Sequence, residues 1–123
     1  MLPNISEFIK NYVTKRENSF FKNDLINNKE KLTIEIKGKS ILVIGGAGTI
    51  GSSYIKAALR YHPSKLIIVD INENGLTELT RTLRSNSNII VPECYLTYPM
   101  SFNSEIFYKM LKKHGSFDII ANF

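Results

Sequence analysis

The sequence predicts an α/β fold in which a parallel sheet is covered by helices on both faces. From residue 39 onward, short apolar runs alternate with stretches that have the amphipathic period of a helix. The apolar runs are nearly continuous, as in strands buried on both faces, and strands joined by helices run parallel. Three glycines directly after the first apolar run mark a turn from strand to helix.

Length and composition fit one globular domain of 123 residues, 43% hydrophobic and 22% charged, with a net charge of +5. Basic residues are scattered, so we expect no nucleic-acid partner. The one cysteine, Cys94, excludes an internal disulfide and is typical of a reducing compartment. Neither a membrane-length apolar run nor a signal peptide is present, so we expect a cytoplasmic protein without stable membrane insertion.

Residues 1–37 are predicted to form a helical arm and linker. Asn4 can cap a helix, with Glu7 three residues later reaching back. The apolar residues that follow share one helical face: Ile5, Phe8, Ile9, Tyr12 and Val13. From residue 15 to 31 the composition is polar and rich in Asn and Lys, which favours a linker or loosely attached arm. We expect the helix to pack on the main domain or on a second subunit of a homo-oligomer.

Residues 38–123 are predicted to form a doubly wound sheet with right-handed crossovers. Strands are expected at residues 40–44, 65–70, 88–95 and 117–122, and helices at 51–61, 72–84 and 103–113. Pro92 favours an edge position or a bulge for the third strand. Because the sequence stops in or just after the fourth strand, we expect the N-terminal half of such a fold, incomplete at its C-terminus, from a longer protein.

The segment ILVIGGAGTIGS, residues 41–52, places glycines at 45, 48 and 51 between a strand and a helix. Gly45 permits the tight turn, Gly48 leaves room for a pyrophosphate against the backbone, and Gly51 lets the helix pack closely. The first amides of the helix would face the anion, with the helix dipole adding to the attraction. The spacing is G-x-x-G-x-x-G, and the alternative is a turn whose glycines only allow the helix to pack.

Asp70 ends the second predicted strand, nineteen positions after Gly51. A carboxylate at this place in a Rossmann-like domain reaches the adenosine ribose hydroxyls. It would repel a 2′-phosphate, so we expect NAD as the cofactor, with NADP as the alternative. The competing interpretation is a carboxylate that caps the helix beginning near Asn72.

The segments VIGGAGTIGS, LIIVDINENGLTEL and FDIIANF resemble the extended short-chain dehydrogenase/reductase superfamily. Within it, residues 38–123 are similar to the nucleotide-sugar 4,6-dehydratases of polysaccharide biosynthesis, such as UDP-N-acetylglucosamine 4,6-dehydratase. The resemblance implies that the Thr49 and Ile50 amides meet phosphate and that Asp70 and Ile71 flank the ribose. The cofactor-binding residues it implies are Gly45, Ala47, Gly48, Thr49, Ile50, Gly51, Asp70 and Ile71.

The resemblance also implies an NAD(P)-dependent removal of water from a nucleotide sugar. The family's Tyr-x-x-x-Lys pair would lie beyond residue 123, so we assign no catalytic residue here and expect the fragment alone to be inactive. Tyr108 and Lys112 match the letters, but their predicted helix precedes the fourth strand, on the wrong side of the sheet for the nicotinamide. We therefore interpret the match as chance.

Two positions depart from the family pattern. Leu96 and Thr97 stand where an aspartate after the third strand commonly reaches the adenine, so a backbone group, Thr97 or packing alone would hold the base. Ile44 replaces a common threonine before the first glycine.

An epimerase of the same superfamily and a non-catalytic NAD(P)-binding module are the alternative functions. No pair of residues has metal-ligand spacing, so we expect no metal.

Overall fold

The computed structural model describes residues 4–123. Its chain divides into two compact units, Met1–Lys31 and Leu32–Phe123. The second unit contains the glycine motif and all the predicted strands. The predicted division into a helical arm and linker, residues 1–37, and a cofactor-binding domain, residues 38–123, stays a prediction.

The first unit is more helical than the sequence predicts. Helix α1 (Ile5–Phe8) continues as the π-helix η1 (Ile9–Thr14), and Asn4 Oδ1 accepts the Glu7 amide at 3.2 Å, which is the predicted cap. The linker expected over residues 15–31 instead contains α2 (Lys22–Asn27) and the start of α3 (Lys29–Ile36). The polar residues of this stretch suit an exposed helix, so their polarity was a poor sign of irregular structure.

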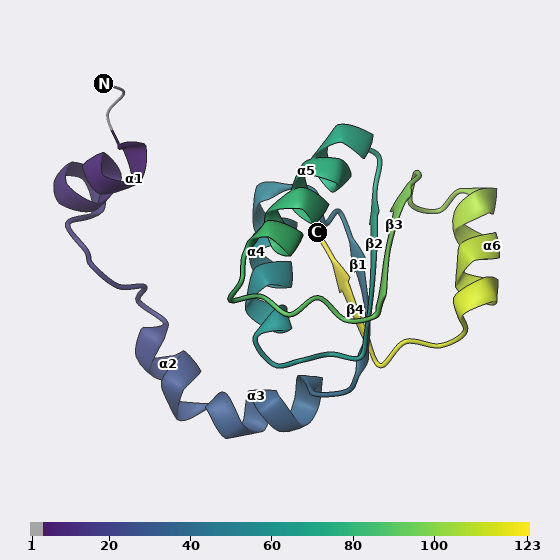
Figure 1. The fold of residues 1–123 in the computed structure, drawn as a ribbon, viewed down its shortest axis with the longest axis horizontal. Helices are drawn as coiled ribbons and strands as arrows, with labels where there is room; N and C mark the ends of the chain where they lie inside the picture. The colour runs from purple at the N-terminus through teal and green to yellow at the C-terminus, as the bar shows by residue number, and fades with distance from the viewer. Residues whose placement is uncertain (1–3) are drawn as a thin grey trace. The chain divides into compact units, whose positions relative to one another are not determined.

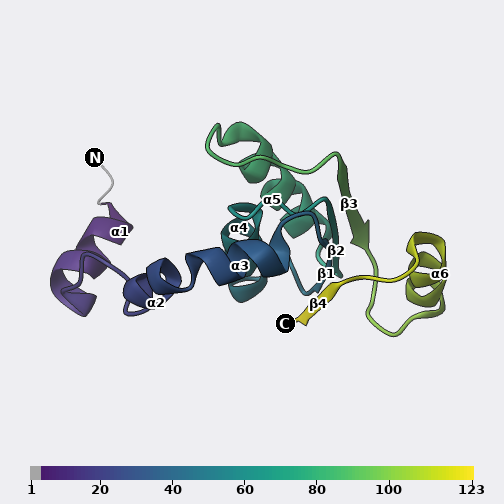
Figure 2. The same cartoon turned by 90° about the horizontal axis from the view of Figure 1, so that it is seen from below.

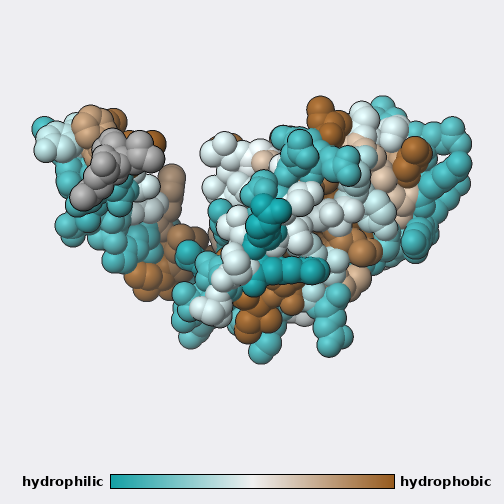
Figure 3. Space-filling model, turned by 45° about the horizontal axis from the view of Figure 1, so that its top comes forward, coloured by the Kyte–Doolittle hydropathy of each residue, from teal (hydrophilic) through white to brown (hydrophobic). Residues whose placement is uncertain are grey.

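The apolar residues of the first unit lie at its surface. Figure 3 shows hydrophobic side chains (brown) exposed among hydrophilic ones (teal). The exposed apolar residues are Ile5, Phe8, Ile9, Tyr12, Val13, Phe20, Phe21, Leu25 and Ile26. Within residues 4–123, no helix combines the length and the apolar character needed to cross a bilayer.

The second unit has a Rossmann-like α/β fold (Figure 1). Its four strands are all parallel and lie in the order β3-β2-β1-β4. This arrangement confirms the predicted fold class. After α3, the elements are β1 (Ser40–Ile44), α4 (Thr49–Leu59), β2 (Lys65–Asp70), α5 (Glu73–Ser85), β3 (Cys94–Pro99), α6 (Glu105–His114) and β4 (Ile119–Asn122).

Helices cover both faces of the sheet, as Figures 1 and 2 show from two directions. Alternate residues of β1 point to opposite faces. On one face, Ile41 and Val43 join a core with α4 and α5. On the other face, Leu42 and Ile44 join a smaller core with Phe107 of α6. The strands β1 and β2 are therefore buried on both sides, which explains their continuous apolar sequence.

The predicted third strand is wrong in its placement. Residues 88–95 were expected to form it, but β3 is Cys94–Pro99, and Pro92 precedes it. Ile89 and Val91 pack against the larger core from outside the sheet, which explains the misleading apolar run. The strand order confirms that the third strand lies at an edge of the sheet, where it is less buried than β1 and β2.

The chain reverses direction across the sheet at β1. Helices α4 and α5 join β1 to β2 and β2 to β3 on one face, and α6 then returns the chain past them to β4 on the other face. Such a reversal opens a crevice at the carboxyl ends of the strands, where ligands of open α/β sheets bind. The fold therefore places the glycine motif and the end of β2 at the expected binding edge.

At the amino-terminal ends of the strands, hydrogen bonds between Ser40 and Asp118 join the beginnings of β1 and β4. Asp118 Oδ2 accepts the Ser40 amide at 2.8 Å and the Ser40 hydroxyl at 2.9 Å. The Asp118 amide lies 3.0 Å from Ser40 Oγ. These hydrogen bonds from Ser40 lower the pKa of Asp118 below its ordinary value of 3.8.

We expect Asp118→Ala to destabilise the protein at neutral pH and much less in strong acid. Because the folded-state pKa is lowered, the carboxylate contributes stability above pH 3.8, and this contribution is lost as the pH falls through the lower folded value. Urea unfolding measures the difference in free energy of unfolding between wild type and variant at pH 7 and at pH 2.5. The lower value is chosen because a pH of roughly 2.5 protonates most carboxylates. Glu78→Ala removes an exposed carboxylate as the control. An equal loss for Asp118→Ala at both pH values would contradict the expectation.

Candidate functional site

The loop between β1 and α4 turns sharply at Gly45. This residue has φ +78°, in the left-handed region that favours glycine. Its amide donates to the carbonyl of Val69 at 2.8 Å, which ties the start of the loop to β2. A Cβ at this position would lie 2.5 Å from the carbonyl oxygen of Phe123. The turn and the close approach of β4 therefore both require glycine here.

Gly51 is also required by the fold. It lies in the first turn of α4 and is buried. A Cβ there would overlap the carbonyl oxygen of Gly45 and lie 2.8 Å from the Cα of Gly46. Gly46 is similarly confined, because its Cβ would overlap the side chain of Ile68. The absence of a side chain at Gly51 lets the helix pack directly on the loop.

Gly48 differs from these glycines because the fold does not require it. Its φ of −74° and ψ of 170° are open to any residue. The nearest atom to an added Cβ is the carbonyl oxygen of Gly45, at the ordinary contact distance of 3.6 Å. The missing side chain therefore leaves free space at the mouth of the loop, beside the beginning of α4.

That free space faces the N-terminus of an eleven-residue helix. Gly48 is the N-cap residue and has no side chain to cap α4, while Thr49 and Ile50 are exposed. The first amides of a helix have no acceptor within the helix, and the dipole makes this end attractive to anions. Free space, amides and helix dipole together fit a phosphate-bearing cofactor.

The carboxylate of Asp70 lies next to the loop and holds it. Its Oδ2 accepts the amide of Ala47 at 2.9 Å, and its Oδ1 accepts the amide of Asn72 at 2.9 Å. The cap of α5 is Asn72, whose Oδ1 accepts the Gly75 amide at 2.9 Å. Asp70 therefore supports the turn before α5 but is not its N-cap, and its second bond reaches across to the glycine loop.

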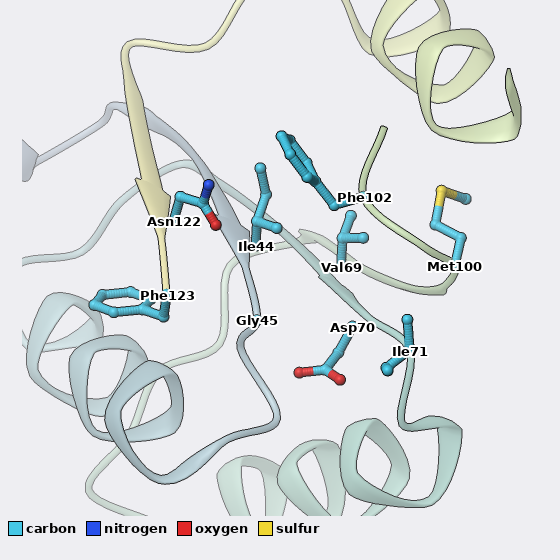
Figure 4. Close-up of a pocket in the computed structure, with 9 residues that line it drawn as sticks. All are labelled: Ile44, Gly45, Val69, Asp70, Ile71, Met100, Phe102, Asn122 and Phe123. Atoms are coloured by element: carbon cyan, nitrogen blue, oxygen red, sulfur yellow. The ribbon is translucent and has the colours of Figure 1, made fainter. Parts of the chain in front are cut away.

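A cleft of about 240 Å³ opens at this edge of the sheet. Figure 4 shows its lining, with the Asp70 carboxylate turned toward the glycine loop and Ile71 following it at the end of β2. The residues that line the cleft are Ile44, Gly45, Val69, Asp70, Ile71, Met100, Phe102, Asn122 and Phe123. The lining thus comes from the carboxyl ends of β1, β2 and β4 and from the loop after β3.

The structure brings the eight predicted cofactor-binding residues to one edge. Gly45, Asp70 and Ile71 line the cleft itself. The others belong to the loop and to the first turn of α4: Ala47, Gly48, Thr49, Ile50 and Gly51. The positions agree with the predicted site, while the binding role of each residue stays a prediction.

The residues expected beside the adenine are wrong. Thr97 pairs with Ile68 and Leu96 pairs with Ile67, so both lie inside β3 and not at its carboxyl end, where the cleft opens. Met100 and Phe102 occupy the end of the third strand instead. This error follows from the wrong placement of the third strand. Met100 and Phe102 could have been identified only from the correct register of β3 against β2.

Gly75 is a site residue that the sequence analysis missed. It lies in the first turn of α5, and an added Cβ would be 2.9 Å from the Cβ of Ala47. The helix after β2 therefore packs tightly on the glycine loop. The sequence shows a glycine five residues after Asp70, but it does not show that this glycine packs against Ala47 of the glycine loop.

Tyr54 of α4 lies beside Phe123, which lines the cleft. Their ring centroids are 5.3 Å apart. Burial raises the pKa of Tyr54 above its ordinary value of 10.0, so its hydroxyl stays protonated at neutral pH. Across residues 4–123, no cluster of three or more His, Cys, Asp or Glu side chains has the arrangement of a metal site.

The chain is similar to several known proteins over the segment that contains the glycine motif. A family described as polysaccharide biosynthesis protein matches residues 41–100, which include all eight predicted cofactor-binding residues. Over 97 residues the chain is 28% identical to (+)-borneol dehydrogenase 2 of Salvia officinalis, covering 79% of this chain and 34% of that protein. The family match covers 60 of the 123 residues, slightly under half of the chain.

Two further similarities are shorter. Over 49 residues the chain is 45% identical to a protein of Methanocaldococcus jannaschii described as an uncharacterized membrane protein, covering 40% of this chain and 15% of that protein. The solved structure of Pen from Bacillus thuringiensis is 32% identical, with a TM-score of 0.41, covering 51% of this chain and 18% of that one. The matches thus span 15% and 34% of the lengths of the two sequence relatives.

Proposed function

We propose that this chain is the NAD-binding part of a nucleotide-sugar 4,6-dehydratase. The observation that carries the proposal is the free space at Gly48, which the fold itself does not require and which faces the uncapped start of α4. A glycine kept open at a helix N-terminus, next to a carboxylate that ends the following strand, is the arrangement that dinucleotide-binding domains use.

Each part of the cofactor has residues suited to it. The amides of Thr49 and Ile50 would hold the pyrophosphate, and the lone pairs of Asp70 that remain after its two backbone bonds would accept ribose hydroxyls. The apolar side chains of Ile71 and Met100 would contact the base. Because a carboxylate repels a 2′-phosphate, we expect NAD to bind more tightly than NADP.

The match to polysaccharide biosynthesis proteins and the dehydrogenase relative support an NAD(P)-dependent enzyme that modifies sugars. When bound, the nicotinamide cofactor supplies a hydride acceptor and donor. This chain binds and orients the cofactor through the glycine loop. We assign no catalytic role to Tyr108 of α6, whose hydroxyl donates a hydrogen bond to Asn103. The substrate we propose is a nucleotide sugar such as UDP-N-acetylglucosamine.

The test is to incubate the protein that carries this chain with NAD⁺ and UDP-N-acetylglucosamine and to follow the sugar nucleotide by mass spectrometry and NMR. Loss of one water from the sugar is the expected result. An unchanged mass with an inverted configuration at C4 would indicate an epimerase instead. Binding of NAD⁺ with no change in this or other nucleotide sugars would indicate a non-catalytic module.

A further inference from the structure

Asp70 contacts the glycine loop at its centre as well as facing the cleft. Ala47 lies between the turn at Gly45 and the open position at Gly48. Its amide donates to Asp70 Oδ2 at 2.9 Å, although the two residues are 23 positions apart. The other carboxylate oxygen accepts the amide of Asn72 at 2.9 Å. One side chain therefore ties the loop to the junction between β2 and α5.

We propose that Asp70 is a positioning residue, which holds the glycine loop in the shape that receives a diphosphate, independently of any contact with ribose. The inference rests on the proposed cofactor site and deepens it. The Ala47 bond sets the direction of one peptide plane in the middle of the loop, because planar peptide units leave the chain only two free dihedrals per residue. The amides that follow Ala47 then begin α4 in a defined orientation.

The chemistry of the two hydrogen bonds requires a carboxylate. An ionised Asp accepts hydrogen bonds at both oxygens, and it has about four lone-pair sites for them. Asparagine has one oxygen and one NH₂ group, so one of the two backbone amides would face a donor. Asp70→Asn would therefore release either Ala47 or Asn72, although the substituted side chain has nearly the same shape.

Packing around Ala47 supports the same role. Gly75 of α5 leaves room for the Ala47 methyl group, since a Cβ on Gly75 would lie 2.9 Å from it. The Gly45 amide is bound to Val69 at 2.8 Å, which anchors the loop at its start. A backbone bond at Gly45, and packing and the Asp70 carboxylate at Ala47, thus hold the loop against β2 and α5.

The experiment compares two ligands that share a diphosphate and a base. ADP has both ribose hydroxyls, and 2′,3′-dideoxy-ADP has neither. Calorimetry would measure both affinities for the wild-type protein and for Asp70→Asn. If Asp70 also positions the loop, the substitution weakens dideoxy-ADP binding by about tenfold, the size of one lost hydrogen bond to a charged group. If Asp70 only binds ribose, dideoxy-ADP binds both proteins equally, and the inference is overturned.

A matched control and a second measurement complete the test. Glu78→Gln makes the same change of carboxylate to amide on the exposed surface of α5 and should leave both affinities unchanged. Hydrogen exchange in the wild-type protein should show a protected Ala47 amide, and rapid exchange there would contradict the bond without any variant. Failure of the wild-type protein to bind ADP at all would instead refute the proposed cofactor site.

Discussion

Replacing Gly48 with valine should weaken NAD⁺ binding by at least about 100-fold, or roughly 2.7 kcal/mol. The new side chain would fill the free space before α4, where we place the pyrophosphate. It would separate the phosphate from the helix amides, whose hydrogen bonds to a charged group contribute about 1.5–3 kcal/mol each. Calorimetric titration of NAD⁺ into the variant measures the loss directly.

The same variant should fold normally. The backbone at Gly48 has a conformation that valine can adopt, and the nearest atom to an added Cβ lies at 3.6 Å. Losing glycine at an N-cap costs at most about 1 kcal/mol. Ala57→Val adds bulk to the exposed surface of the same helix as the control and should leave NAD⁺ affinity intact. A folded Gly48→Val protein with wild-type affinity would refute the pyrophosphate site.

Replacing Gly51 with alanine should instead destabilise the fold, with a loss of about 3 kcal/mol in the free energy of unfolding. The added methyl group would overlap the carbonyl oxygen of Gly45 and crowd the backbone of Gly46. These are backbone atoms, and the Gly45 amide is bound to Val69 of β2, so they cannot move aside cheaply. Urea denaturation followed by circular dichroism measures the change.

Helix propensity makes this a strict test, because glycine to alanine inside a helix stabilises it by about 0.5–1 kcal/mol when nothing is in the way. Lys56→Ala, at an exposed position of α4, provides the comparison for an alanine that meets no neighbouring atoms. A Gly51→Ala protein as stable as the wild type would mean that the loop does not pack on α4 as described. Together the two glycine variants separate a position used for binding from one used for folding.

The order of the elements could be predicted from the sequence because the signals involved are local. The continuous apolar runs of β1 and β2 reflect burial on both faces, and glycines at 45, 48 and 51 mark the turn into α4. Asp70 could be placed at the end of β2 for the same reason. Since parallel strands end at one edge, this was enough to bring the glycine loop and the carboxylate together.

The third strand could not be predicted in this way. Its apolar pattern is weak because β3 is an edge strand, while Ile89 and Val91 are apolar through contacts outside the sheet. The pairing of Asp70 with Pro99 sets the register of β3, and that pairing depends on the neighbouring strand rather than on local sequence. Met100 and Phe102 reached the cleft only through that register.

The sequence by itself determined the fold class, the glycine turn and the acid at the end of β2, because hydrophobic period and backbone conformation act over a few residues. Only the tertiary structure decided which glycine is free for a ligand and what Asp70 holds. Those answers depend on atoms from distant segments: the Phe123 carbonyl that confines Gly45, and the Ala47 amide that Asp70 accepts across 23 positions.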